Sequence, residues 1–228
     1  MSSRELMKDI VKWDVMNWSN AISFWDEKIK SLPHERNCLE LGGHEGGLSL
    51  WLAMKGNVVV CSDIELPEEK ARALHNKYNC SEFISYEKID ATNLPKDRKF
   101  DIVIFKSIMG GVSANGEDHL KQKMIDEIYE SLADDGVLLF AENLEASGLH
   151  KWFRKKFINW GNRWNYLKYN EIEKLLSNFK DVEFETVGFF GTFGRSEWQR
   201  KILSRIDVLV SFMIPKNKKY IVYGIAKK

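Results

Sequence analysis

The chain has 228 residues, of which 44% are hydrophobic and 29% are charged, and its formal net charge is +1. These values predict a single domain with a full hydrophobic core and do not favour a nucleic-acid-binding protein. No apolar run approaches the roughly 20 residues that a membrane span needs, and the mixed N-terminus does not resemble a signal peptide. Three cysteines without metal-ligand spacing favour reduced thiols and a cytoplasmic location.

Short apolar strands alternate with helical segments through the middle of the chain. After a helical extension over residues 1–36, we expect a core over residues 37–145. Its strands are predicted at residues 38–41, 57–61, 84–89, 100–105 and 136–141, and its helices at 48–54, 68–78 and 119–132. Nearly continuous apolar strands joined by helices are typical of a parallel sheet that is covered on both faces.

The last third of the chain follows a different pattern. An insertion over residues 145–168 precedes a C-terminal part over residues 170–228. There we expect a helix over 170–179, a strand over 182–190, a helical stretch over 196–212 and a final strand over 219–226. No internal repeat or linker divides the sequence, so residues 1–228 are predicted to form one domain.

A glycine-rich turn over residues 42–47 follows the first strand and opens a helix. Glycines permit a positive φ and close approach of a ligand, and the helix behind them offers free N–H groups. Dehydrogenases also have such turns, but three acidic residues make this one more specific. Glu40 lies inside the first strand, and Asp63 and Asp90 end the second and third strands. These carboxylates can meet ribose hydroxyls and an adenine amino group at one edge of the sheet.

These residues resemble the class I S-adenosylmethionine (SAM) dependent methyltransferases, in particular bacterial members that act on small molecules or glycans. The matching segments are residues 40–46, Asp63, residues 90–91, 100–105 and 135–139. The resemblance implies a three-layer α/β fold. A Rossmann-like sheet of seven mostly parallel strands would have an antiparallel last strand and helices on both faces.

The resemblance also implies a cofactor site for SAM, with S-adenosylhomocysteine as product. The implied cofactor-binding residues are Glu40, Gly42, Gly43, His44, Gly46, Asp63, Ile64, Asp90, Ala91 and Lys106. Lys106 and Ser107 would border the reactive methyl group. His44 occupies the middle glycine of the family's Gly-x-Gly-x-Gly pattern, so we expect either a different backbone angle there or a ligand contact.

Two residues near the fifth strand are candidates for a general base. His150 lies in the insertion and Glu142 at the strand's end, whereas His119 is expected at the surface. Methyl transfer is an SN2 displacement in which positioning supplies much of the acceleration, so a base is not required. No Cys/His cluster or carboxylate set predicts a metal site.

Aromatic residues occur at helical spacing in both the N-terminal extension and the insertion. Trp13, Trp18, Phe24 and Trp25 are expected to pack on the sheet or to form a lid over the cofactor. The segment 149–160 combines four cations with several aromatics and no acid. We expect it to cap the acceptor pocket with its aromatics facing the core. Contact with a membrane surface over 150–160 and nucleic-acid binding are alternatives.

Taken together, the sequence predicts SAM-dependent methylation, with O-methylation of a small molecule or glycan favoured. The segment at the end of the fourth strand lacks the Asn/Asp-Pro-Pro-Tyr sequence of amino-directed enzymes. One alternative is an NAD-dependent oxidoreductase or epimerase, which would place an apolar residue at Glu40. Another is a SAM-binding module without catalytic activity, which the histidine in the glycine loop would suit.

Overall fold

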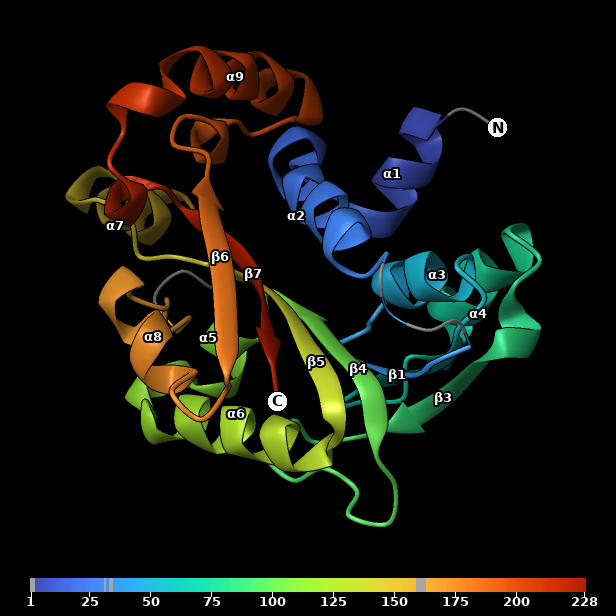
Figure 1. Ribbon diagram of the computed structural model, residues 1–228. Coiled ribbons are helices and arrows are strands. Elements are labelled where there is room, and N and C mark those ends of the chain that lie inside the picture. The colour runs from blue at the N-terminus through green and yellow to red at the C-terminus, as the bar shows by residue number, and fades with distance from the viewer. Residues whose placement is uncertain (1–2, 31, 33–34, 159–162) are drawn as a thin grey trace.

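Across the described residues (3–30, 32, 35–158 and 163–228) of this computed structural model, seven strands form one sheet with the order β3-β2-β1-β4-β5-β7-β6 (Figure 1). They are β1 (Asn37–Leu41), β2 (Val58–Asp63), β3 (Ile84–Lys88), β4 (Phe100–Lys106), β5 (Leu132–Asn143), β6 (Asp181–Val187) and β7 (Ile221–Lys227). Among them β7 alone runs against its neighbours, because it pairs antiparallel with both β5 and β6. The predicted sheet with an antiparallel last strand is therefore confirmed.

Helices cover both faces of this sheet, and alternation along the strands decides which face each side chain meets. In β4, Ile102 and Ile104 pack with the first four helices, whereas Val103 and Phe105 pack with the helices of the other face. The first set comprises α1 (Ser3–Val11), α2 (Val15–Lys28), α3 (Gly47–Ala53) and α4 (Glu68–Lys77), and the second α5 (Met109–Val112), α6 (His119–Ser131) and α8 (Ile172–Leu175) (Figure 1).

Two further helices, α7 (Gly148–Phe157) and α9 (Glu197–Val210), follow the ends of β5 and β6 and lie at the same end of the molecule as α2 (Figure 1). The carboxyl ends of the parallel strands point to this end. Among the described residues, none of the helices combines the length and the apolar character needed to cross a membrane.

The N-terminal helices are anchored to the sheet by buried tryptophans. Trp18 and Trp25 are fully buried, and the indole Nε1–H of Trp25 donates to the carbonyl of Gly224 in β7 at 2.8 Å. Buried indoles combine a large apolar area with one directed hydrogen bond. α2 is thus fixed to β7.

Two predicted elements differ most from the prediction in their bounds. The helix expected over 170–179 is reduced to a 3-10 turn, Tyr169–Glu171, and the single turn of α8. Ser177 and Asn178, which compete with the backbone for hydrogen bonds, follow that turn and favour an end to the helix. β5 begins before the predicted residue 136, because Leu132 already pairs with Phe100 ahead of a register shift between Phe100 and Ile102.

Candidate functional site

The loop between β1 and α3 needs glycine at two positions. Gly42 and Gly46 both have φ +69°, in the left-handed region. A Cβ atom on Gly42 would overlap Cγ2 of Ile108, and one on Gly46 would lie 2.5 Å from Nε2 of His75. The loop therefore depends on glycine both for its backbone angles and for its packing.

His44 has a positive φ, which is uncommon for a residue other than glycine. Its φ is +30°, and its backbone N–H donates to Oδ2 of Asp63 at 3.0 Å. The side chain is exposed and is not among the described residues that line the neighbouring pocket. Both expectations for His44, the altered backbone angle and the ligand contact, therefore stay predictions.

Glu40, in β1, stabilises the glycine loop from the side away from the pocket. Its buried carboxylate accepts the backbone N–H of Ser49 at 2.8 Å and that of Leu48 at 3.3 Å, together with the hydroxyl of Ser49. Burial raises the pKa of this carboxyl to about 7. The carboxylate thus satisfies the free N–H groups at the start of α3 and orients the loop instead of lining the pocket.

His75 was not predicted, yet it supports the same loop from α4. Its Nε2 lies 2.8 Å from the carbonyl oxygen of Gly46 and its Nδ1 lies 2.7 Å from the hydroxyl of Tyr86. The ring is buried, and burial lowers its pKa. His75 follows the buried Ala71 by one helical turn, so both lie on the inward face of α4. This helical spacing could have indicated from the sequence that His75 is buried.

A pocket of about 530 Å³ opens beside the loop at the carboxyl ends of β1, β2 and β4. Five predicted cofactor-binding residues line it, namely Gly42, Asp63, Ile64, Asp90 and Ala91. The other lining residues are Ile89, Thr92, Ser107, Ile108, Gly111, Val112, Leu120 and Trp164. A mainly apolar wall with a few carboxylates and hydroxyls suits a ligand that has both a flat base and hydroxyl groups.

Both pocket carboxylates are oriented by their own loops. Asp63 accepts the N–H of Ile64 at 2.7 Å through Oδ1, in addition to its bond from His44. Asp90 accepts the N–H and the hydroxyl of Thr92, both at 2.8 Å. A carboxylate oxygen has more than one acceptor position, so each group can still accept a ligand hydroxyl or amine.

The remaining predicted residues lie next to the pocket without lining it. Gly43 is behind the loop, where its N–H donates to the carbonyl of Ser62 at 2.7 Å and a Cβ would meet Sγ of Cys61 at 2.8 Å. Gly46 and Glu40 are also behind it, as described above. All three cysteines belong to the described residues and are buried free thiols.

Lys106 lies at the end of β4 beneath the N-terminal helices. Its Nζ is 4.7 Å from the ring centre of Trp18 and 5.5 Å from that of Trp13. The carboxylates of Glu142 and Glu40 favour its charged form, but burial is the larger effect and lowers its pKa to about 8. The aromatic residues of the N-terminal extension therefore cover the end of β4.

Glu142 holds the loop that follows β4. Its buried carboxylate accepts the N–H of Met109 and that of Asn143, both at 2.7 Å, and burial raises its pKa to about 7. Asn143 in turn donates to the hydroxyl of Ser107 at 2.5 Å. Ser107 has φ +57°, so this bond fixes a strained residue at the pocket wall.

His150 is far less accessible than a general base needs to be. It is fully buried, with Nδ1 2.7 Å from the hydroxyl of Ser147 and Nε2 2.9 Å from the carbonyl of Phe189. Burial lowers its pKa to about 4. It is not among the described residues that line the pocket. We therefore interpret His150 as a packing residue that fixes α7, and the geometry does not favour the predicted catalytic role.

The segment after α7 covers the glycines of the loop after β4, which sequence reasoning did not predict. A Cβ on Gly110 would overlap the indole of Trp164, and the N–H of Asn165 donates to the carbonyl of Gly110 at 3.0 Å. Ile89, Thr92 and Leu120 are further lining residues that were missed. In the sequence, the adjacent glycines 110 and 111 were the one indication that a bulky side chain packs against this loop.

The aromatics of α7 do not all face the core, contrary to the expectation. Phe153 packs against Phe193 with ring centres 5.0 Å apart, but Trp152 and Phe157 are exposed. Trp160 lies outside the described residues. The buried residues of α7 are His150 and Arg154. Because these polar side chains occupy its inward face, aromatic residues are left on the outward face.

His119 is exposed at the start of α6, as predicted. Within the described ranges, no group of three or more His, Cys, Asp or Glu side chains is placed to hold a metal ion.

No protein-family model and no curated protein matches this chain, but many solved structures do. Phosphoethanolamine N-methyltransferase 2 from Haemonchus contortus, solved with S-adenosyl-L-methionine, matches with a TM-score of 0.63 and 16% identity over 100% of this chain and 60% of that one. N-methyltransferase NodS from Bradyrhizobium japonicum WM9 matches with 0.59 and 14% over 92% and 95%. CurJ carbon methyltransferase matches with 0.57 and 14% over 91% and 53%. The chain therefore has the Rossmann-like fold that these methyltransferases share.

Proposed function

We propose that this protein is a SAM-dependent methyltransferase that methylates an oxygen atom of a small molecule or glycan. The observation that supports it best is the pocket that brings together Gly42, Asp63 and Asp90 at the carboxyl edge of the sheet. Open α/β sheets bind ligands at this edge. Bound SAM would supply an electrophilic methyl group on a sulfonium sulfur.

The residues of the pocket suit the parts of this cofactor. Asp63 would accept the ribose hydroxyls, because its carboxylate is already held by two backbone N–H groups. Asp90 would accept the adenine amino group, with the base against the apolar side chains of Ile64 and Ile89. Gly42, which has no side chain, would let the methionine part pass close to the backbone.

The chain's own residues at the ends of β4 and β5 would position the acceptor. Glu142 and Asn143 fix the loop after β4 through two hydrogen bonds, one to Met109 and one to Ser107. Lys106 lies beside this loop, and its ammonium group can donate to an acceptor oxygen. Trp13 and Trp18 cover it and exclude water. Such orientation supplies much of the rate in an SN2 displacement, so we assign no general base.

Oxygen is the acceptor atom that we favour, on the ground of the sequence after β4. Residues 105–108, Phe-Lys-Ser-Ile, lack the Asn/Asp-Pro-Pro-Tyr pattern of amino-directed enzymes. The names of the similar structures include both nitrogen and carbon methyltransferases, so this fold accommodates several acceptors. The basic and aromatic α7 suits a sugar or an anionic acceptor.

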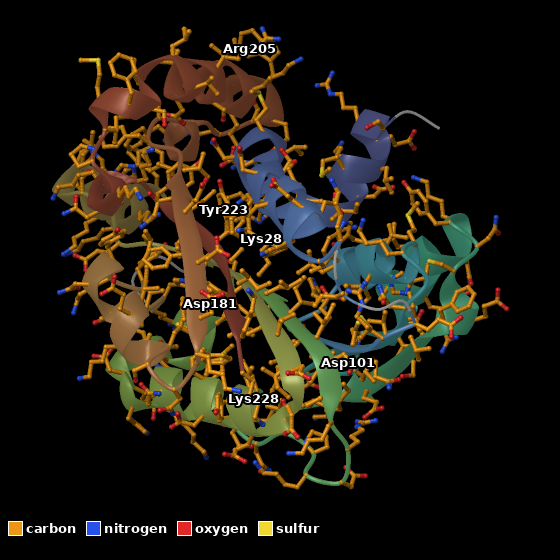
Figure 2. The ribbon with its side chains drawn as sticks, viewed as in Figure 1. Lys28, Asp101, Asp181, Arg205, Tyr223 and Lys228 are labelled. Carbon is orange, nitrogen blue, oxygen red and sulfur yellow. The ribbon has the colours of Figure 1, made fainter. Side chains whose placement is uncertain are left out.

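Calorimetric titration with S-adenosylhomocysteine tests the cofactor, with NAD titrated in parallel. We expect binding of S-adenosylhomocysteine alone, weakened about tenfold or more by Asp63→Asn, because hydrogen bonds to a charged group contribute about 1.5–3 kcal/mol. Asp101→Asn is the matched control, since this half-buried carboxylate accepts the N–H of Asn37 at the start of β1 and does not line the pocket (Figure 2). Binding of NAD instead, or binding of neither ligand, would refute the proposal.

Product formation tests the reaction. S-adenosylhomocysteine release is measured with a panel of hydroxylated sugars and small molecules, and with amines as the contrasting acceptors. Turnover of amines alone would refute oxygen as the acceptor atom. Cofactor binding without turnover of any compound would favour the alternative of a binding module.

A further inference from the structure

The outward face of α9 is apolar, which is the reverse of an ordinary surface helix. Such helices turn their apolar stripe towards the core. Here Trp198, Leu209 and Phe212 are 70%, 73% and 86% exposed. The positions 198, 202, 206 and 209 recur at helical spacing on one side. We define the α9 apolar face as five residues of α9 and two of the 3-10 turn that follows it, all exposed: Trp198, Ile202, Ile206, Val208, Leu209, Phe212 and Met213.

Polar residues on the inward side keep this face outward. Asp207 is buried and accepts the N–H groups of Phe190 and Gly191 at 2.7 and 3.0 Å. Ser204 is also buried and accepts from the amide of Asn17 in α2 at 2.7 Å. Rotating α9 to bury its apolar side chains would break these hydrogen bonds. The N–H groups and the amide that they satisfy would then lose their partners, which is costly for buried polar groups. The exposure is therefore built into the packing.

α7 extends the apolar surface at the same end of the molecule (Figure 1). Its Leu149, Trp152 and Phe157 are exposed. The guanidinium of Arg195, just before α9, lies 4.5 Å from the ring centre of Phe157, so the two helices present adjoining surfaces.

Cations surround these side chains, and the acidic residues of the region are engaged. Residues 195–219 contain seven Lys or Arg and two acids, and α7 contains no acid at all. Of the two acids, Asp207 is buried, and Glu197 pairs with Arg200 and accepts the N–H of Asp14. Lys155 and Arg205 are exposed, and Figure 2 shows Arg205 on the outer side of α9.

We infer that this surface docks on an anionic lipid bilayer. Exposed Trp, Phe and Leu side chains flanked by Lys and Arg are the pattern of helices that lie in the membrane interface. The apolar side chains would enter the headgroup region while the cations meet lipid phosphates. This extends the membrane alternative for residues 150–160 to α9, which has the larger apolar face. The inference goes beyond methyl transfer and does not depend on it.

Two other occupants fit the surface less well. In a symmetric pair of copies the same patch meets itself, so cations would face cations without exposed acids to compensate them. Nucleic acid can stack on rings such as those of Trp198 and Phe212, but it would leave the exposed aliphatic side chains of Ile202, Ile206 and Leu209 in water, whereas a bilayer buries them. The combination of cations with an aliphatic area therefore favours the lipid surface.

Co-sedimentation of the full chain with vesicles tests the inference. We expect binding to an equal mixture of phosphatidylcholine and phosphatidylglycerol, and little binding to phosphatidylcholine alone. The triple variant Trp198→Ser, Leu209→Ser, Phe212→Ser should weaken binding by about tenfold or more, because it removes the inserted apolar area. Lys155→Glu with Arg205→Glu should also weaken it and reduce its salt dependence.

The matched control replaces three exposed apolar residues elsewhere, Met54→Ser, Leu66→Ser and Phe83→Ser, and should bind vesicles like the unaltered protein. Circular dichroism confirms that each variant is folded. Failure of the unaltered protein to bind anionic vesicles, or equal binding by the α9 variant, would overturn the inference. Self-association in sedimentation velocity that the α9 variant abolishes, without vesicle binding, would also overturn it and identify a second copy as the occupant.

Discussion

Protonation of His150 should weaken the folded state at mildly acidic pH. Burial lowers the pKa of this imidazole from 6.5 to about 4. Between these pH values the unfolded chain binds one more proton than the folded protein, so the free energy of unfolding falls as the pH falls. At 1.36 kcal/mol per pKa unit, the full difference is about 3 kcal/mol. Stability from this group is complete above about pH 6.5 and is lost towards pH 4.

Urea unfolding at a series of pH values, followed by tryptophan fluorescence, measures this effect. His150→Gln removes the titrating ring but keeps a donor for Phe189 and an acceptor for Ser147. We expect the variant to lose less stability than the unaltered protein between about pH 6.5 and 4. His119→Gln, at an exposed histidine, is the control. Parallel curves for the unaltered protein and His150→Gln would refute the reasoning.

Buried carboxylates act in the opposite direction, but they do not affect this comparison. Burial raises the pKa of Glu40 and Glu142 to about 7 and that of Asp14 to about 6. Their contributions to stability are present at low pH and are lost as the pH rises through these values. Because the same carboxylates are present in His150→Gln, they cancel in the difference between the two curves.

Three further predictions concern the loops and the N-terminal helices. Gly42→Ala should lower stability by about 1–3 kcal/mol and weaken binding of S-adenosylhomocysteine, because of its positive φ; unchanged calorimetric affinity would contradict this. Trp25→Phe should cost about 1–3 kcal/mol in urea unfolding by losing its bond to Gly224, whereas Trp198→Phe at the surface should change little. Glu142→Ala should cost about 2–4 kcal/mol by leaving two backbone N–H groups unpaired, and equal stability would exclude that role.

The sheet could be predicted because its strands carry the strongest pattern in the sequence. Runs such as residues 102–105 are apolar throughout, since both faces of a parallel strand are buried. The prediction of a helix over 170–179 was wrong in length, because the spacing of apolar residues does not show where the helix ends. Ile172 and Leu175 are buried as the period indicated, although most of the helix around them is absent.

The site was predictable where its residues follow strands and unpredictable where distant segments meet. Asp63 and Asp90 could be placed at one edge because parallel strands share their carboxyl end. Trp164 lines the same pocket from a segment with no sequence signal of its own. His150 was selected for its chemistry and its place after β5, but the sequence contains no measure of burial by Phe189 and Phe193.

The position of β7 also affects how the protein is made. This strand fills the gap between β5 and β6 and follows both of them in the chain, so each has an unpaired edge until residues 221–227 have been synthesised. The indole of Trp25 lacks its hydrogen-bond partner, the carbonyl of Gly224, until that distant residue has been synthesised. Open strand edges invite pairing with other chains. We therefore expect nascent or truncated chains without residues 221–227 to need chaperones and to aggregate when these are scarce.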